Sequence, residues 1–236
     1  SNPAALAYNP SNGYVYVANK GSDTVSVIKG TKVIAEVSVR YKPLFQGQRY
    51  GPVALLYNPS NGYVYVANKD SWTVSVINGT KVIADIFVKS GPIALLYNPS
   101  NGYVYVITEG LGSVLIISGT RIIGEVYVGY NLISPIYNPS NGYVYVANKD
   151  SWTVSVINGT KVVAKVSVGS VRTYGLVEEK TYSVPVLLYN PSNGYVYVAN
   201  EYSDSVSVID GTRVIANVPV GNRPVALAYN HSNGYV

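Results

Sequence analysis

The ten-residue phrase Tyr-Asn-Pro-Ser-Asn-Gly-Tyr-Val-Tyr-Val occurs five times in this sequence of 236 residues and begins a sixth time with His in place of Pro. The copies start at Tyr8, Tyr57, Tyr97, Tyr137, Tyr189 and Tyr229. Three of the five steps between copies span about 40 residues, which is typical of an array of repeated supersecondary units. The first and fourth steps are longer, because each contains an insertion. This periodicity constrains the fold more than any other feature of the chain.

Each repeat contains four short segments that have the composition of β-strands. In the second repeat these segments are Pro52–Tyr57, Tyr63–Ala67, Thr73–Ile77 and Lys81–Val88, separated by turn residues such as Asn61-Gly62. The first segment is apolar throughout, which predicts a strand buried on both faces. The second alternates Tyr and Val, so its Tyr side chains share one face of the sheet and its Val side chains share the other.

Four antiparallel strands in every repeat predict the blades of a β-propeller, an all-β fold. We expect one propeller segment over residues 1–236, with five complete four-stranded blades and a partial sixth. The predicted blades span approximately 1–50, 51–90, 91–130, 131–182, 183–221 and 222–236. A linear solenoid of hairpins is the alternative, and it fits less well because the first strand is too apolar for an edge. Both ends fall inside the repeat pattern, so we interpret the chain as a segment of a longer protein.

Composition excludes several classes of protein. Cys is absent, which removes disulfides and thiolate chemistry, and no apolar run is long enough to span a membrane. The net charge is +5, but most Lys and Arg residues recur singly in turns, so nucleic-acid binding is not expected. Open blade faces would provide a route to self-association.

The phrases that follow the repeated decapeptide resemble the YVTN repeat. The resemblance is clearest at Tyr195–Asn200, Ser203–Thr212 and Val218–Pro224, and the third repeat departs from it at Ile107–Gly110 and Ile116-Ile117. The YVTN family consists of β-propellers common in archaeal surface-layer and other extracellular proteins. The resemblance therefore implies a propeller at the cell surface or outside the cell, in a family that also includes lactonase-like and dehydrogenase-like enzymes.

A four-stranded meander places its loops on two rims of each blade. The first rim carries the turns between strands one and two and between strands three and four, and the second rim carries the middle turns and the links between blades. Both insertions, 40–50 and 170–182, and both Trp residues belong to the second rim. Because Tyr, Trp and Arg dominate interface energetics, we predict a binding surface there. Its predicted contacts are Tyr41, Phe45, Arg49, Tyr50, Trp72, Trp152, Arg172, Tyr174 and Tyr182.

The first rim carries one cation per repeat, at equivalent turn positions. These residues are Lys32, Lys81, Arg121, Lys161 and Arg213. A ring of cations would suit an anionic glycan, but such turn residues more often only keep a rim soluble.

No residue cluster in the sequence predicts a catalytic, metal or cofactor site. The first strands of the repeats contain no Asp, Glu or His, and His231 is the one histidine. Asp23 and Asp204 occupy equivalent middle turns beside Ser and are interpreted as turn residues, with calcium binding as the alternative. Glu178 and Glu179 are adjacent and form a poor acid–base pair.

Three asparagines stand in N-glycosylation sequons: Asn78, Asn158 and Asn230. The segments Tyr57–Val82 and Tyr137–Val162 are identical at every position, which favours a multivalent or structural role over blade-specific catalysis.

The sequence thus predicts a non-enzymatic extracellular or cell-surface module, without cofactor or metal, that binds a protein or a surface glycan in adhesion or assembly. One alternative is a propeller enzyme, lactonase-like or quinone-dehydrogenase-like, with its active residues outside this segment. A second alternative is the subunit of an extracellular filament.

Overall fold

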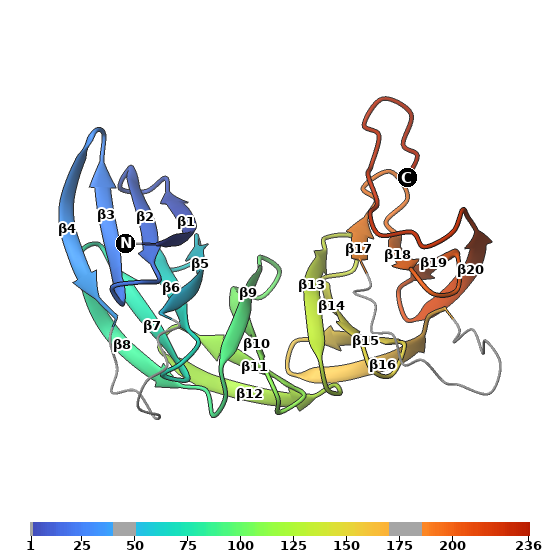
Figure 1. Ribbon diagram of the computed structural model, residues 1–236, viewed down its shortest axis with the longest axis horizontal. Coiled ribbons are helices and arrows are strands. Elements are labelled where there is room, and N and C mark those ends of the chain that lie inside the picture. Colours follow the sequence, from blue (N-terminus) through green and yellow to red (C-terminus); the bar gives the residue numbers. More distant parts are fainter. Residues whose placement is uncertain (1, 40–50, 170–185) are drawn as a thin grey trace. The chain divides into compact units, whose positions relative to one another are not determined.

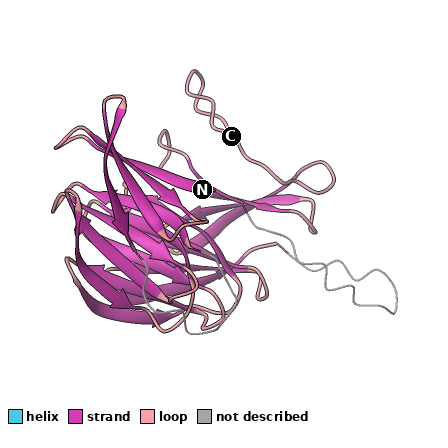
Figure 2. Ribbon diagram, turned by 60° about the vertical axis from the view of Figure 1, so that its left-hand side comes forward, coloured by secondary structure: helices cyan, strands magenta, loops and turns pink. Residues whose placement is uncertain are grey.

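The computed structural model describes residues 2–39, 51–169 and 186–236. Within these ranges the chain forms twenty strands and no helix (Figures 1 and 2). The strands form five separate sheets, and each sheet is an antiparallel meander of four consecutive strands. The prediction of an all-β fold built from four-stranded blades is confirmed.

The strand bounds repeat from one sheet to the next. The first three sheets contain β1 (Pro3–Asn9), β2 (Tyr14–Asn19), β3 (Thr24–Lys29) and β4 (Lys32–Ser38); β5 (Pro52–Asn58), β6 (Tyr63–Asn68), β7 (Thr73–Asn78) and β8 (Lys81–Phe87); and β9 (Pro92–Asn98), β10 (Tyr103–Thr108), β11 (Ser113–Ser118) and β12 (Arg121–Tyr127). The last two contain β13 (Leu132–Asn138), β14 (Tyr143–Asn148), β15 (Thr153–Asn158) and β16 (Lys161–Ser167); and β17 (Val186–Tyr189), β18 (Val196–Asn200), β19 (Ser205–Asp210) and β20 (Arg213–Pro219).

The chain divides into two compact units, Ser1–Glu125 and Val126–Val236. Unit 1 holds the first three sheets, and unit 2 holds the last two. Residues 220–236, which contain the sixth copy of the repeated phrase, form turns but no strand.

Within each unit the sheets bury one another by interleaving Tyr and Val side chains. In unit 1, Tyr65 of β6 is fully buried among residues of the following sheet, including Val104 and Val106 of β10. In unit 2, Tyr145 of β14 packs in the same way against Val196 and Val198 of β18. The Tyr face of one sheet therefore covers the Val face of the next, because neither face could remain in water without a large cost.

The first strands are less buried than their composition predicted. In β5 and β9 only Pro and Asn at the two ends are buried, and the five residues between them are half-buried. Each first strand is the edge of its sheet, so one side of it lacks a strand partner. The fourth strand is amphipathic, since Asp85 of β8 is exposed and Ile86 is buried.

Within each unit, a buried asparagine at the end of a first strand links one sheet to the next. Asn58 ends β5 with no exposed surface, and its Nδ2 donates a hydrogen bond to the carbonyl oxygen of Gly102 in the following sheet, at 3.0 Å. Its Oδ1 accepts from the backbone N–H of Ser60 at 2.8 Å, which also fixes the local turn. Gly102 adopts a left-handed conformation with φ +75°, which glycine reaches without steric cost.

The same asparagine link recurs in both units. In unit 1, Asn9 bonds to Gly62, and in unit 2, Asn138 bonds to Gly194 and Asn190 to Gly234. The Asn of the repeated phrase is therefore a bridge between sheets as well as a turn residue.

Two further hydrogen bonds from the same phrase cross between sheets. The Ser60 hydroxyl bonds to the Tyr97 hydroxyl at 2.5 Å, and Tyr65 Oη donates to the carbonyl oxygen of Gly119 at 2.8 Å. Asn61 Nδ2 donates in turn to Tyr65 Oη at 2.9 Å. The first rim is thus occupied by a repeated network of hydrogen bonds that joins adjacent sheets.

Replacing Asn58 by Ala should lower the free energy of unfolding by about 1–3 kcal/mol, because it leaves a buried carbonyl and a buried N–H without partners. Urea unfolding followed by far-UV circular dichroism measures the change. The control is Asn78→Ala, whose side chain is exposed on the first rim and whose removal should change stability by less than about 0.5 kcal/mol. Equal losses in the two variants would contradict the bridging role.

Burial raises the pKa of Tyr16, Tyr65, Tyr105 and Tyr145, although hydrogen bonds from neighbouring Asn side chains oppose the shift. The folded state therefore holds these phenolic protons to higher pH than the unfolded state, whose Tyr pKa is about 10. The contribution of these tyrosines to the free energy of unfolding should be constant below about pH 10 and should fall as the pH rises beyond it.

Urea unfolding at about pH 8 and about pH 11 tests this expectation. The Tyr65→Phe variant should be less stable by about 1 kcal/mol at the lower pH, and its stability should fall less steeply at the higher pH. If the free energy of unfolding fell as steeply with pH in this variant as in the unmodified protein, the buried tyrosines would not be the cause of the loss.

Candidate functional site

The second rim has an unusual backbone conformation at the ends of its middle turns. It consists of the middle turns 20–23, 69–72, 109–112, 149–152 and 201–204, together with the links between sheets. The last residue of each middle turn has a left-handed backbone, and four of these residues are not glycine. Their φ angles are +55° at Asp23, +54° at Trp72, +52° at Trp152 and +47° at Asp204. Bulky residues rarely adopt this conformation, and such strain is concentrated at functional sites.

The second rim also contains buried amides that are only half satisfied. Asn148 ends β14 without exposed surface, and its Nδ2 donates to Thr153 Oγ1 at 2.7 Å and to Ser155 Oγ at 3.1 Å. Its Oδ1 has no hydrogen-bond partner within the described residues, and the same holds for Oδ1 of Asn68 and Asn200. The second rim is therefore less completely bonded than the first, where the equivalent Asn amides use both ends.

The two tryptophans have identical neighbours in sequence but different neighbours in space. Trp72 in unit 1 lies near Phe87 of its own sheet, with ring centroids 6.5 Å apart. Trp152 in unit 2 makes an edge-to-face contact with Tyr202 of the next sheet, with centroids 6.1 Å apart and an interplanar angle of 84°. The residue that corresponds to Tyr202 in the sheet after Trp72 is Gly110, which offers no ring.

Tyr202 also contacts Arg223 on the second rim of unit 2. The Arg223 guanidinium lies 5.3 Å from the centre of the Tyr202 ring, a distance at which cation–π attraction operates. Arg223 also donates to Glu201 Oε1 from Nε at 3.2 Å and from Nη2 at 2.9 Å. The hydrogen bond to Glu201 raises the pKa of Arg223, so the guanidinium remains charged. We call Trp152, Tyr202, Arg223 and Glu201 the rim patch.

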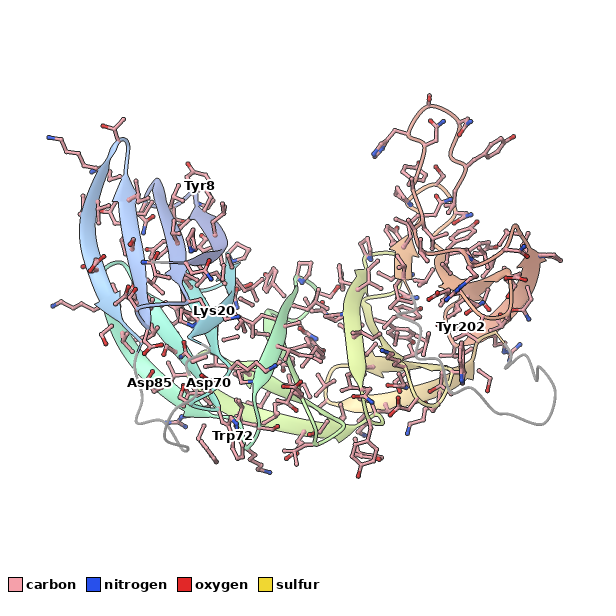
Figure 3. The ribbon with its side chains drawn as sticks, in the orientation of Figure 1. Tyr8, Lys20, Asp70, Trp72, Asp85 and Tyr202 are labelled. Atoms are coloured by element: carbon pink, nitrogen blue, oxygen red, sulfur yellow. The ribbon has the colours of Figure 1, made fainter. Side chains whose placement is uncertain are left out.

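Figure 3 labels Tyr202 of this patch in unit 2. In unit 1 it places Trp72 near Asp70, away from Tyr8 at the other end of the blades. Trp72 and Tyr8 thus belong to different rims, as the meander predicted.

The second rim of unit 1 also carries two ion pairs. Lys69 Nζ lies 2.7 Å from Glu109 Oε2, and Lys89 Nζ lies 2.6 Å from Glu125 Oε2. The hydrogen bond from Lys89 lowers the pKa of the Glu125 carboxyl, with a second contribution from the Ser113 hydroxyl, although partial burial opposes the shift. Glu125 is therefore an anion at neutral pH and is not suited to act as a general acid.

Most of the predicted binding residues lie outside the described ranges. Only Trp72 and Trp152 can be placed, and both are half-buried on the second rim. The others are Tyr41, Phe45, Arg49, Tyr50, Arg172, Tyr174 and Tyr182, and the binding role of the whole set stays a prediction.

The remaining candidates lie in turns and at strand ends. The five first-rim cations begin the fourth strands and are exposed. Asn78 and Asn158 are exposed in first-rim turns, whereas Oδ1 of Asn230 accepts hydrogen bonds from the backbone and hydroxyl of Ser232. His231 makes an edge contact with the Tyr229 ring at 4.7 Å.

The described residues contain no group of three or more His, Asp or Glu side chains that could hold a metal ion. They also include no helix with the length and apolarity needed to cross a membrane.

Three residues of the rim patch were not singled out from the sequence. Tyr202 stands where the two identical repeats have Asp70 and Asp150, and Glu201 stands where they have Lys69 and Lys149. This departure from the repeat is the sequence signal by which Tyr202 and Glu201 could have been identified. Their contact with Arg223, in the link that follows β20, depends on the path of that link and could not be read from spacing alone.

Solved structures with the same fold support the β-propeller assignment. A hydrazine synthase from Kuenenia stuttgartiensis is 20% identical with a TM-score of 0.63, and the match covers 95% of this chain and 76% of that chain. Virginiamycin B lyase from Staphylococcus aureus is 14% identical with a TM-score of 0.61, and the match covers 92% and 69%.

A periplasmic gluconolactonase from Pseudomonas aeruginosa is 15% identical with a TM-score of 0.60, and the match covers 94% of this chain and 72% of that chain. No family model matches the sequence, and no curated protein matches it. The fold is therefore that of the β-propellers, and the narrower resemblance to the YVTN repeat lacks a family match.

The comparisons correct one expectation. The sequence was interpreted as a non-enzymatic module, but the proteins that share its fold include a named lactonase and a named lyase. The expectation failed because it relied on the repeated, nearly identical blades, and a shared fold does not exclude catalysis, since one scaffold hosts many functions.

Replacing Trp72 by Gly should leave unit 1 more stable than replacing it by Ala, by about 1 kcal/mol, because both changes remove the indole but only Gly adopts the left-handed backbone freely. Thermal unfolding of the two variants measures the difference. The same pair of changes at Thr73, which lies in a strand, should give the opposite order. If Trp72→Ala were more stable than Trp72→Gly, the left-handed backbone at position 72 would not be strained.

Proposed function

We propose that this chain supplies blades of a propeller enzyme of the lactonase or lyase kind that works outside the cytoplasm. The observation that carries the proposal is the match of nearly the whole chain to a periplasmic gluconolactonase and to a virginiamycin B lyase. The resemblance to the YVTN repeat supports an extracellular or cell-surface location, and the periplasmic location in the name of one similar protein agrees with an exported compartment.

The difference in hydrogen bonding and backbone geometry between the two rims supports substrate entry on the second rim. Hydrogen bonds between sheets occupy the Asn, Ser and Tyr side chains of the repeated phrase on the first rim, so substitutions of those residues would disrupt the stack. Left-handed non-glycine residues, half-buried aromatic rings and half-satisfied amides lie on the second rim. The sequence predicts that Tyr41, Phe45, Arg49 and Tyr174 are contacts of the same rim.

We assign no reactive group of this proposal to the described residues. Among them, Glu125 is held as an anion by Lys89, which does not suit a general acid. In this proposal the described residues position and shield a substrate, and we derive no chemical step from them.

The test is a lactone-opening assay on the purified chain. D-glucono-1,5-lactone and γ-butyrolactone are supplied separately, and proton release is followed with an indicator dye, with and without added Mg²⁺, Ca²⁺ or Zn²⁺. We expect at least one lactone to open on the order of ten times faster than in buffer, which corresponds to about 1.4 kcal/mol of barrier lowering.

Protein unfolded by heat provides the control, because it retains the composition and loses the fold. The proposal fails if the folded chain accelerates neither lactone under any of these metal conditions.

A further inference from the structure

We infer that the rim patch of unit 2 is a subsite for one ring of a neutral carbohydrate. The inference concerns binding alone, and it does not depend on whether the chain opens lactones. It rests on four side chains that come from two adjacent sheets and the link that follows them.

The patch offers an apolar surface of the right kind. In an edge-to-face pair, one of the two rings contributes only its edge, so this contact leaves both faces of that ring uncovered. Trp152 and Tyr202 are both half-buried, so neither ring is enclosed by the protein. A pyranose ring presents a face of C–H groups, which packs on an aromatic face while its hydroxyls point outward.

The patch also offers fixed donors and acceptors beside that surface. Arg223 and Glu201 form a pair in which both Nε and Nη2 of the guanidinium bond to a single carboxylate oxygen, Oε1. The other oxygen of Glu201 can accept from a hydroxyl, and the remaining guanidinium N–H groups can donate to one. Neighbouring hydroxyls on a sugar ring require this combination of acceptor and donor.

The charge of the patch favours a neutral ligand. Glu201 neutralises Arg223, and the carboxylate of Asp204 accepts the backbone N–H of Arg223 at 2.9 Å. In the turn that holds Trp152, the opposite charges of Lys149 and Asp150 offset each other. An anionic ligand would be repelled by these carboxylates, and a cationic ligand would meet the guanidinium over Tyr202.

The geometry of the patch is fixed in advance by its backbone. Trp152, Asp204 and Arg223 all have left-handed φ angles, of +52°, +47° and +55°. Such strained conformations persist only where the surrounding structure holds them, so the side chains are positioned without a ligand.

The chain contains its own matched control. Trp72 lies in a turn with the same sequence as that of Trp152, but its neighbouring sheet has Gly110 in place of Tyr202, and its ring lies near Phe87 instead. If the patch is the subsite, only the Trp152 copy of this turn should contribute to binding.

The experiment titrates the full chain with maltotetraose, cellotetraose and mannotetraose, each at millimolar concentration. Saturation-transfer NMR detects the bound ring, and Trp fluorescence gives the dissociation constant. We expect at least one tetrasaccharide to bind. Trp152→Ala and Tyr202→Gly should each weaken that binding on the order of tenfold, and Trp72→Ala should leave it unchanged.

Arg223→Met keeps much of the length of the side chain and removes its donors, so it should weaken binding without unfolding unit 2. Circular dichroism confirms the fold of every variant. Two results would overturn the inference: no binding of any of the three tetrasaccharides, or an equal loss of affinity in Trp72→Ala and Trp152→Ala.

Discussion

The structure depends on an amide buried between sheets. Asn58 has no contact with solvent, and it joins its own turn to the carbonyl of Gly102 in the next sheet. The apolar interleaving of Tyr65 with Val104 and Val106 supplies most of the driving force, but hydrophobic attraction has no preferred direction and does not by itself fix the register of the sheets. A buried amide fixes it, because a small displacement leaves two polar groups unpaired at a cost of about 1–3 kcal/mol each. The asparagine therefore sets the position of one sheet on the next.

Much of this architecture could be predicted from the sequence because two levels of pattern agree. The spacing of the repeated phrase defines the unit, and alternation within Tyr63–Ala67 assigns the faces of its second strand. The bridging role of Asn58 was not foreseen, since Asn-Pro-Ser-Asn-Gly is explained equally well as a local turn. The half-burial of β5 was not foreseen either, because an apolar run does not reveal that its strand is the edge of the sheet.

The candidate site was predicted only in outline. The second rim and Trp152 were identified from the meander and from composition, but Tyr202, Glu201 and Arg223 were not. Contacts such as that between Arg223 and Tyr202 depend on the path of a link with a left-handed backbone, which the sequence does not specify. The repeats also misled the prediction of function. Near-identical blades suggested a module without catalytic activity, whereas the same fold occurs in proteins that are named as enzymes.

The identical turns around Trp72 and Trp152 have a wider consequence. One and the same stretch of sequence produces a ring beside Phe87 in one sheet and a ring against Tyr202 in another. The sequence of a turn therefore does not determine the surroundings of its Trp side chain. Those surroundings depend on Phe87 or Ser167 of the same blade and on Gly110 or Tyr202 of the following one. A duplicated turn can thus acquire a new surface through changes in the residues that pack beside it, while its own sequence stays the same.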